Sequence, residues 1–206
     1  MTQPGHPARR SQYRVDLVPH AEAARFVARN HYARGMANTS VLSCGLFRTS
    51  DGALVGACTF LPTLGNSARG LSATPKRVLS LSRLCVAPGE GTNAATLLLG
   101  AALRLLGRDP RWTLVVTYAD EGEGHTGTIY RASNWTYQGA TRARVRWVDP
   151  ATDRMVSTKR AGHTRTREEM IALGYEARGP FRKHRFVYAL DRGRRRPAPQ
   201  LSLFGE

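Results

Sequence analysis

The residues that could carry out chemistry lie in polar segments that follow apolar stretches. Asp120 follows the apolar run 112–118, and His125 lies in the glycine-rich segment behind it. A carboxylate in such a place can accept a proton, and together with a histidine it can hold a metal ion. The alternative role of Asp120 is to cap the loop that follows. We therefore treat Asp120 as a candidate proton acceptor or, with His125, as a candidate metal ligand.

Arg83 is a second candidate, because it lies inside the apolar run 78–86. A guanidinium buried without a partner is costly. We expect it to pair with a carboxylate, for example Asp120, or to point into a cleft at the substrate. Tyr118 and Tyr130 could stack on a flat substrate or donate a hydrogen bond, although core tyrosines would give the same pattern.

The elements that must position these residues form a strand, a helix and a second strand, expected at 78–86, 93–106 and 112–118. Thr92 can cap the helix and Gly107 can end it. Two strands joined by one helix make a right-handed crossover. Their carboxyl-end loops, 87–92 and 119–127, then lie on one edge of the sheet, where ligands usually bind.

Flanking segments extend this unit into a larger sheet. We expect a strand at 13–18, a helix from Pro19 towards Asn30, a hairpin of 41–49 and 53–61, a short helix near 130 with a turn at 139, a helix behind the capping box 166–169, and a closing strand at 181–190. Cys44 and Cys58 lie almost symmetrically about the hairpin turn. They could face each other there, and we expect both, like Cys85, to be reduced thiols.

A basic strand is expected near 142–147. Arg142, Arg144 and Arg146 alternate with apolar residues, so an extended chain places the three guanidinium groups on one face. With Lys159 and Arg160 of the following hairpin they are candidates for DNA contact. The alternative is a solvated edge strand, where arginines discourage aggregation.

The composition points to a polyanionic partner. Lys and Arg number 31 against 15 Asp and Glu, a net charge of +16, and the pI is near 11.1. Nucleic acid is the first candidate, while a basic surface in contact only with solvent would have the same composition. No apolar run reaches the ~18 residues that span a membrane, and the first residues lack an apolar secretion segment. We expect a cytoplasmic protein.

The order of elements resembles the core of the GCN5-related N-acetyltransferases (GNATs), which bind acyl-CoA with its pyrophosphate at the start of the helix. GNATs carry Arg/Gln-x-x-Gly-x-Gly/Ala in that turn, where this chain has Pro88-Gly-Glu-Gly-Thr-Asn93. The backbone amides could still hold an anion, and Glu90 would oppose it. The candidate cofactor-binding residues are Gly89, Gly91, Thr92, Asn93 and Asn134.

A second set of motifs is similar to the Mom family of phage DNA-modification proteins. The set comprises His31-Tyr32, Leu81-Ser82-Arg83-Leu84, Asn93, Tyr118-Ala119-Asp120, His125-x-Gly127 and Ile129-Tyr130-x-Ala132-x-Asn134. The resemblance implies a GNAT-like enzyme that adds a carbamoylmethyl group to the exocyclic amine of adenine in DNA and so blocks restriction. It also makes His31 and Tyr32 candidate site residues.

Neither the donor nor a metal requirement follows from the sequence. An acyl-CoA or a related molecule is one candidate donor, and a metal ion such as iron is a candidate cofactor, with His31, Asp120 and His125 as its candidate ligands. The adenine amine is a poor nucleophile, so the enzyme must position it and take its proton. The amine is also out of reach inside a duplex, and the nucleotide would have to be flipped out.

The C-terminal tail differs from the rest of the chain. Residues 192–199 are basic and proline-rich and should form an extended linker. The segment Gln200-Leu201-Ser-Leu203-Phe204 resembles the binding motif for the bacterial sliding clamp, with Leu203 and Phe204 filling an apolar pocket. The alternatives are a tail that folds back on its own domain or has no partner.

We therefore predict an α/β fold, a GNAT-like central mixed β-sheet flanked by helices, in a single domain with a flexible basic C-terminal tail. The expected divisions are a flexible N-terminus at 1–12, a GNAT-like catalytic domain at 13–191, and a disordered linker with a clamp-binding tail at 192–206. The leading function is Mom-like transfer to the N6 amine of adenine in DNA. The alternatives are an acetyl-CoA-dependent N-acetyltransferase on another amine, and a non-catalytic DNA-binding protein tethered to the sliding clamp.

Overall fold

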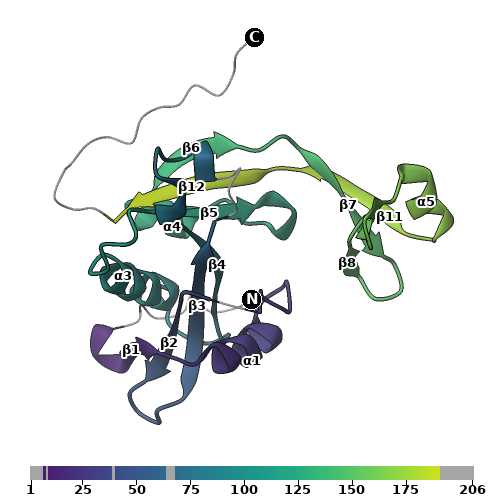
Figure 1. Ribbon diagram of the computed structural model, residues 1–206. Helices are drawn as coiled ribbons and strands as arrows, with labels where there is room; N and C mark the ends of the chain where they lie inside the picture. Colours follow the sequence, from purple (N-terminus) through teal and green to yellow (C-terminus); the bar gives the residue numbers. More distant parts are fainter. Residues whose placement is uncertain (1–6, 8, 39, 64–67, 191–206) are drawn as a thin grey trace. The chain divides into compact units, whose positions relative to one another are not determined.

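The computed structural model describes residues 7, 9–38, 40–63 and 68–190 (Figure 1). The helices are α1 His20–Asn30, α3 Ala94–Leu106, α4 Thr128–Ala132 and α5 Arg167–Ala172, with short 3-10 turns η1 Arg10–Gln12, η2 Pro75–Arg77 and η3 Glu121–Glu123. The strands are β1 Tyr13–Leu17, β2 Leu42–Arg48, β3 Leu54–Pro62, β4 Val78–Val86, β5 Leu114–Asp120, β6 Thr136–Ala140, β7 Arg144–Asp149, β8 Arg154–Val156, β9 Lys159–Arg160, β10 His163–Thr164, β11 Glu176–Phe181 and β12 Lys183–Ala189.

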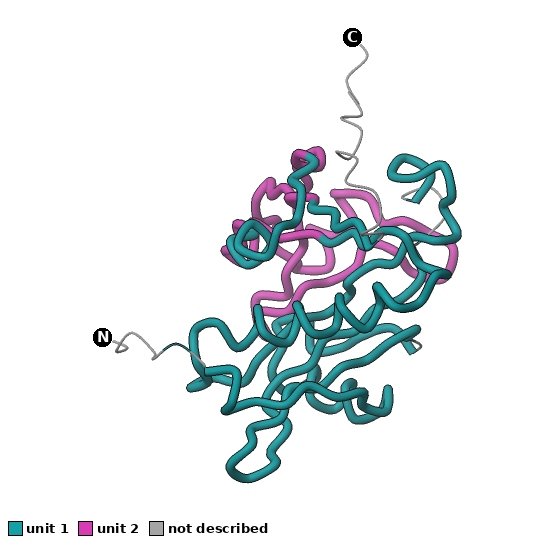
Figure 2. Tube along the Cα trace, turned by 90° about the vertical axis from the view of Figure 1, so that its left-hand side faces the viewer, with its two compact units in different colours: residues 1–117, 127–138, 186–206 teal, residues 118–126, 139–185 magenta. Residues whose placement is uncertain are grey.

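The chain divides into two compact units (Figure 2). Unit 1 comprises residues 1–117, 127–138 and 186–206, and unit 2 comprises residues 118–126 and 139–185. Strands β5, β6 and β12 each have residues in both units. Within the described part of the chain, no helix is long and apolar enough to cross a bilayer.

The largest sheet has seven strands in the order β1-β2-β3-β4-β5-β12-β6. Strands β1 to β4 pair antiparallel, and the hairpin signal at Asp51-Gly52 correctly predicts the pairing of β2 with β3, whereas β4 and β5 pair parallel. A parallel pair needs a crossover connection, and α3 provides it. The predicted strand–helix–strand unit is therefore confirmed.

Helices α1 and α3 cover opposite faces of this sheet. Phe26 and Val27 of α1 pack against Ala57 of β3, and Ala57 pairs with Gly45 of β2. The next residue along β2, Leu46, points to the other face, where it lines a groove together with Leu97 of α3. Burial on both faces explains why the central strands are continuously apolar.

The hairpin of β2 and β3 brings Cys44 directly opposite Cys58, as predicted. Both side chains are buried, and both are free thiols. A hydrogen bond from Cys58 lowers the pKa of Cys44, while burial raises the pKa of Cys58 well above its ordinary value. Because the two thiols face each other, they titrate as a coupled pair.

Unit 2 contains the antiparallel sheet β11-β7-β8 and the pair β10-β9. Helix α5 begins with the predicted capping box, in which the Thr166 hydroxyl accepts from the backbone N–H of Glu169 and the Glu169 carboxylate accepts from that of Thr166. Trp147 and Val148 of β7 are buried. The apolar face predicted for β7 is wrong at Val145, whose side chain is 41% exposed.

Several predicted boundaries are also wrong. The second core strand spans Leu114–Asp120 and not 112–118. The turn expected at 139 lies in strand β6, and β11 was not expected. Asn93, and not Thr92, occupies the N-cap of α3, with no hydrogen bond from its side chain. Short polar strands such as β6 and β11 carry weak local signals, and only their pairing partners stabilise them.

Candidate active site

Asp120 is the centre of a charged network in unit 2. Its side chain is 6% exposed and forms ion pairs with Arg146 of β7 and with Lys183, the latter at 3.2 Å. Arg146, 14% exposed, also pairs with Glu123 at 2.6 Å. Asp120 further accepts a hydrogen bond from the Gly122 amide at 3.1 Å and so caps η3. The capping role is therefore present, together with a buried ion pair.

Gly122 allows this network to form. A Cβ atom built on Gly122 would lie 2.6 Å from Nη1 and 2.7 Å from Nη2 of Arg146. The guanidinium therefore occupies the space that any larger residue would fill, and it packs over the Phe181 ring, with Cζ 5.1 Å from the ring centroid. Glycine in the segment after β5 is therefore explained by the close packing of Arg146 as well as by the turn of the backbone.

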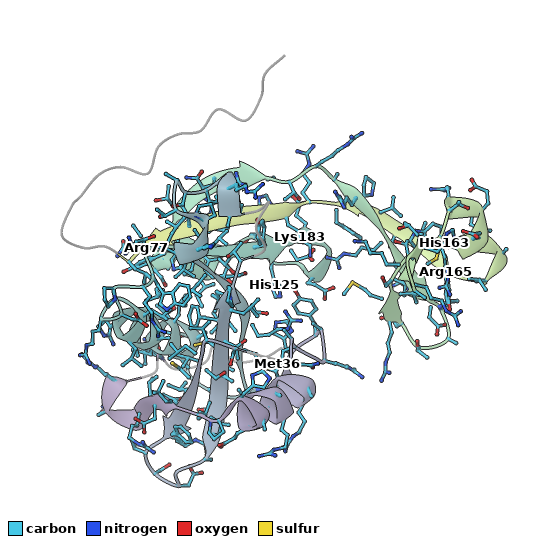
Figure 3. The ribbon with its side chains drawn as sticks, viewed as in Figure 1. Met36, Arg77, His125, His163, Arg165 and Lys183 are labelled. Atoms are coloured by element: carbon cyan, nitrogen blue, oxygen red, sulfur yellow. The ribbon has the colours of Figure 1, made fainter. Side chains whose placement is uncertain are left out.

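The loop after β5 is also tied to the start of β12 and to the residue that precedes it. His184 Nε2 lies 2.9 Å from Glu121 Oε1, and the Arg182 amide donates to the Glu121 carboxylate at 2.8 Å. The His125 amide donates to the Asp120 carbonyl at 3.1 Å. His125 and Lys183, both labelled in Figure 3, belong to unit 2.

Arg83 lies in unit 1, on β4. Its Nε donates to the Gly35 carbonyl and its Nη1 to the Ser82 carbonyl, each at 2.7 Å. The expected carboxylate partner is wrong, because the guanidinium is satisfied by backbone oxygens. Gly35 belongs to the segment after α1 that contains His31 and Tyr32, so Arg83 holds that segment against the sheet. Sequence spacing gave no sign of this contact.

His31 is held in one orientation at the end of α1. The Ala33 amide donates to Nδ1 at 3.0 Å, so the neutral ring carries its proton on Nε2. A metal-bound histidine instead uses its second nitrogen to donate a hydrogen bond. His31 therefore does not fit the role of metal ligand while this contact persists, and it can donate through Nε2.

Tyr130 is buried at the fork where β4 and β5 separate. The two strands pair only through Val78–Ser80 and Leu114–Val116. Just beyond, Thr117 Oγ1 lies 3.4 Å from the Leu81 carbonyl oxygen and 3.3 Å from the Tyr130 hydroxyl. Burial raises the pKa of Tyr130, although the hydrogen bond from Thr117 lowers it. Tyr130 is therefore a neutral hydroxyl that can donate a hydrogen bond.

These contacts divide the predicted catalytic residues into two groups. Unit 1 contains His31, Tyr32, Arg83 and Tyr130, and unit 2 contains Tyr118, Asp120 and His125. Tyr32 is 44% exposed and its ring centroid lies 4.3 Å from that of His31. Tyr118 is half-buried on β5. Two contacts were not predicted from the sequence. Thr117 contacts Tyr130 in unit 1, and Arg146 pairs with Asp120 in unit 2.

The turn before α3 carries a neutralised acid. Glu90 pairs with Arg48 at 2.5 Å and has only 7% of its side chain exposed. It also accepts from the Tyr13 hydroxyl at 2.7 Å, and burial together with this bond raises the pKa of Tyr13. Glu90 therefore does not present an unpaired charge to a ligand, and Arg48 and Tyr13 are the partners that sequence reasoning missed.

The predicted cofactor residues of this turn do not form a ready phosphate cradle. The Gly91 amide already donates to the Tyr13 hydroxyl at 3.3 Å. Asn93 Oδ1 is buried and, within the described residues, accepts no hydrogen bond. Thr92 is exposed. These residues do not fit the pyrophosphate of CoA as the structure stands.

Two of the remaining cofactor candidates have backbone explanations. Gly89 has φ 88° and Asn134 has φ 60°, both in the left-handed region. Glycine enters this region without strain, and asparagine does so more readily than most residues. Asn134 lies two residues after the end of α4, behind the C-cap Ser133, so its place in the motif is explained by the turn that ends the helix.

The predicted DNA-contacting residues differ in their surroundings. Arg142, Arg144, Lys159 and Arg160 are exposed in unit 2. Arg146 is committed to the ion pairs with Asp120 and Glu123. The clamp-binding residues Gln200, Leu201, Leu203 and Phe204 lie outside the described residues.

No metal site is formed by side chains of the described ranges. Among residues 7, 9–38, 40–63 and 68–190, no group of three or more His, Cys, Asp and Glu residues could hold a metal ion. Asp120, a candidate ligand, is occupied by Arg146 and Lys183.

Solved structures show the fold. Spermidine N-acetyltransferase from Vibrio cholerae, in complex with CoA and spermine, matches with a TM-score of 0.53 at 9% identity, over 87% of this chain and 96% of that one. Ribosomal-protein-S5-alanine acetyltransferase from Vibrio fischeri matches with a TM-score of 0.53 at 6% identity, over 90% and 97%. The mixed sheet flanked by helices is therefore that of the GNAT acetyltransferases, as predicted.

Sequence relatives show the family. The methylcarbamoylase Mom of Escherichia phage Mu is 30% identical over 135 residues, which are 63% of this chain and 54% of that protein. This chain thus spans about half the length of the curated relative that it matches. The model of the Mom protein family matches residues 12–202. Because that match includes nearly the whole sequence, the chain belongs to the Mom protein family.

Proposed function

We propose that this protein is a transferase that modifies the N6 amine of adenine in DNA, by a carbamoylmethylation like that implied by the Mom resemblance, and so protects DNA from restriction. One observation carries the proposal. Within unit 1, Arg83 holds the segment behind His31 and Tyr32, the ring centroids of these two residues lie 4.3 Å apart, and the Tyr130 hydroxyl is buried against Thr117.

The contacts support distinct roles for these residues. Tyr130 offers a neutral hydroxyl, which can donate a hydrogen bond to the oxygen where negative charge develops during transfer. His31 offers a second donor at Nε2. Tyr32 is a half-exposed ring on which a flipped base could stack. Arg83 is a positioning residue, because its hydrogen bonds go to the backbone.

The proton of the adenine amine needs an acceptor, and Asp120 remains our candidate. In the structure its carboxylate is held by Arg146 and Lys183. Such pairing favours the charged form and weakens a base. Asp120 can therefore act as the base only if a partner moves away from it, and the alternative is that it only maintains the loop after β5.

Nucleosides from plasmid DNA test this proposal. Mass spectrometry would compare DNA from bacteria that express the intact protein, the Tyr130→Phe variant or the control Tyr175→Phe, a half-buried tyrosine of unit 2. We expect a heavier deoxyadenosine with the intact protein and the control, and a strong loss with Tyr130→Phe. Unmodified DNA from soluble, well-expressed protein in a host that supports a known Mom enzyme would contradict the proposal.

A CoA-dependent N-acetyltransferase is the second candidate, supported by the fold neighbours, one of which is bound to CoA and spermine. Two features oppose it here. The turn before α3 lacks a ready phosphate cradle, and a protein of net charge +16 repels polyamines. Isothermal calorimetry with CoA tests this second candidate, because a protein that does not bind CoA cannot be a CoA-dependent acetyltransferase.

DNA and the sliding clamp are the partners that we propose. Exposed arginines of unit 2 support the first, and the motif Gln200–Phe204 supports the second. A pull-down with purified clamp should depend on those five residues. If deletion of these five residues leaves clamp binding unchanged, the clamp proposal is wrong. A non-catalytic DNA-binding protein tethered to the clamp would be indicated if substitutions at Arg83 and Asp120 left every cellular effect unchanged.

A further inference from the structure

We infer that the C-terminal end of α3 is a second DNA-binding surface, which contacts the phosphate backbone away from the site of modification. The surface consists of Arg10, Arg77, Arg104 and Arg108. This inference rests on the proposed function, because it takes DNA as the partner.

The four arginines surround two grooves that meet at one helix end. A groove of about 590 Å³ is lined by Arg77, Arg104 and Arg108, and one of about 330 Å³ is lined by Arg10 and again by Arg104 and Arg108. All four side chains are exposed. The planar guanidinium group of an arginine can donate two parallel hydrogen bonds to two oxygens of a phosphate group.

This surface has little acid to neutralise it. Among the described residues, none of the four arginines forms an ion pair with a carboxylate. Arg77 donates to the carbonyls of Pro110 and Arg111. The single acid in the grooves, Asp109, is paired with Arg111 at 2.6 Å, which holds its pKa at about 2. The positive charge at the C-terminal end of α3 is therefore available to bind a polyanion.

The distribution of charge favours unit 1 as a contact surface. Its described residues include fifteen Lys and Arg against five Asp and Glu, whereas those of unit 2 include twelve against eight. The predicted basic strand of unit 2 therefore accounts for the smaller part of the net positive charge. Interaction with the dipole of α3 would by itself explain Arg104 and Arg108 at the end of the helix. It does not explain Arg10 and Arg77, which belong to other elements.

The surface is separate from the group around Arg83. Arg77 directly precedes β4, and Arg83 lies six residues further along the strand, roughly 20 Å at about 3.3 Å a residue. Figure 3 also shows Arg77 apart from Met36, the neighbour of Gly35, whose carbonyl accepts from Arg83. About 20 Å corresponds to roughly six base pairs of duplex. One DNA segment can thus touch both places.

The salt dependence of DNA binding tests this inference. Fluorescence anisotropy of a labelled 30-base-pair duplex, from about 50 to 200 mM KCl, would compare the full chain with Arg104→Gln/Arg108→Gln. Each phosphate contact contributes about 0.9 to the slope of log K against log salt. We expect the variant to have a shallower slope by about 1.8 and weaker binding at low salt. The matched control is Arg25→Gln/Arg29→Gln, two exposed arginines at the same spacing on α1.

The outcomes separate this inference from the proposed function. If the intact protein fails to bind DNA, both are contradicted. If the intact protein binds DNA and both double variants change the slope of log K against log salt equally, the effect is due to net charge. The inference of a DNA-binding surface at α3 is then wrong. Unchanged DNA binding with loss of binding to phosphatidylserine vesicles would assign the arginines to a lipid surface instead. Circular dichroism melting confirms that each variant is folded.

Discussion

Replacing Asp120 by Asn separates a structural role from a catalytic one. The amide oxygen can still accept from the Gly122 amide, but the charge that pairs with Arg146 is lost. Removal of one partner of a buried ion pair costs about 3–5 kcal/mol. Arg146 keeps its pair with Glu123. We therefore expect Asp120→Asn to lower the free energy of unfolding by about 2–3 kcal/mol, at or below the lower end of that range.

The reciprocal substitution completes a thermodynamic cycle. Arg146→Met alone leaves Asp120 buried with Lys183, whose side chain is 55% exposed. The double variant removes both charges of the pair, so we expect it to be more stable than the sum of the single losses predicts, by about 1–3 kcal/mol. Lys183→Met is the control, and because the Lys183 side chain is 55% exposed, its loss should cost no more than about 1 kcal/mol.

Urea denaturation measures these free energies, and hydrogen exchange at 121–124 localises them. Nucleoside mass spectrometry of plasmid DNA reports activity for the same variants. If Asp120 maintains the loop, the double variant regains part of its stability and activity together. If Asp120 accepts the proton, activity stays lost whatever the stability. An Asp120→Asn protein as stable as the parent would refute the buried ion pair itself.

Three further predictions follow from individual contacts. Gly122→Ala should destabilise the protein about as much as Asp120→Asn, because its Cβ would displace the Arg146 guanidinium; an unchanged urea midpoint would contradict this. Burial raises the pKa of Cys85 to about 11, so at pH 8 its thiolate fraction, and with it the rate of alkylation by iodoacetamide, should be about two hundred times lower than for an ordinary cysteine. Reaction at the ordinary rate would show that the thiol is exposed. Arg48→Met should cost about 2 kcal/mol by leaving the buried Glu90 carboxylate without its cation, and Glu90→Gln in the same protein should restore part of that loss in urea denaturation.

Local patterns were sufficient for most of the sheet. The strand at 78–86, the helix that ends at 106 and the hairpin about Asp51-Gly52 were predicted from apolar runs and turn residues, and the structure confirms them. The facing thiols Cys44 and Cys58 followed from the symmetry of that hairpin. By contrast, β11 and the strand at 139 were missed, because polar strands of five or six residues depend on pairing partners for their stability.

Motif residues were easier to find than their partners. His31, Arg83 and Tyr130 could be singled out from the family resemblance, and Asp120 from its place after an apolar run. The sequence predicted that Arg83 pairs with a carboxylate or points into a cleft at the substrate, and in the structure it donates to the carbonyls of Gly35 and Ser82. A buried donor must be satisfied, but the sequence does not say by which acceptor.

The sequence by itself determined the order of the elements, the family and the excess of positive charge, because each depends on residue type and local spacing. Only the tertiary structure decided which charges meet. Arg146 lies 26 residues from Asp120 and Arg48 lies 42 residues from Glu90. Such pairs form because folding brings distant strands and turns together and excludes water from their charges, and no periodicity of the chain encodes that encounter.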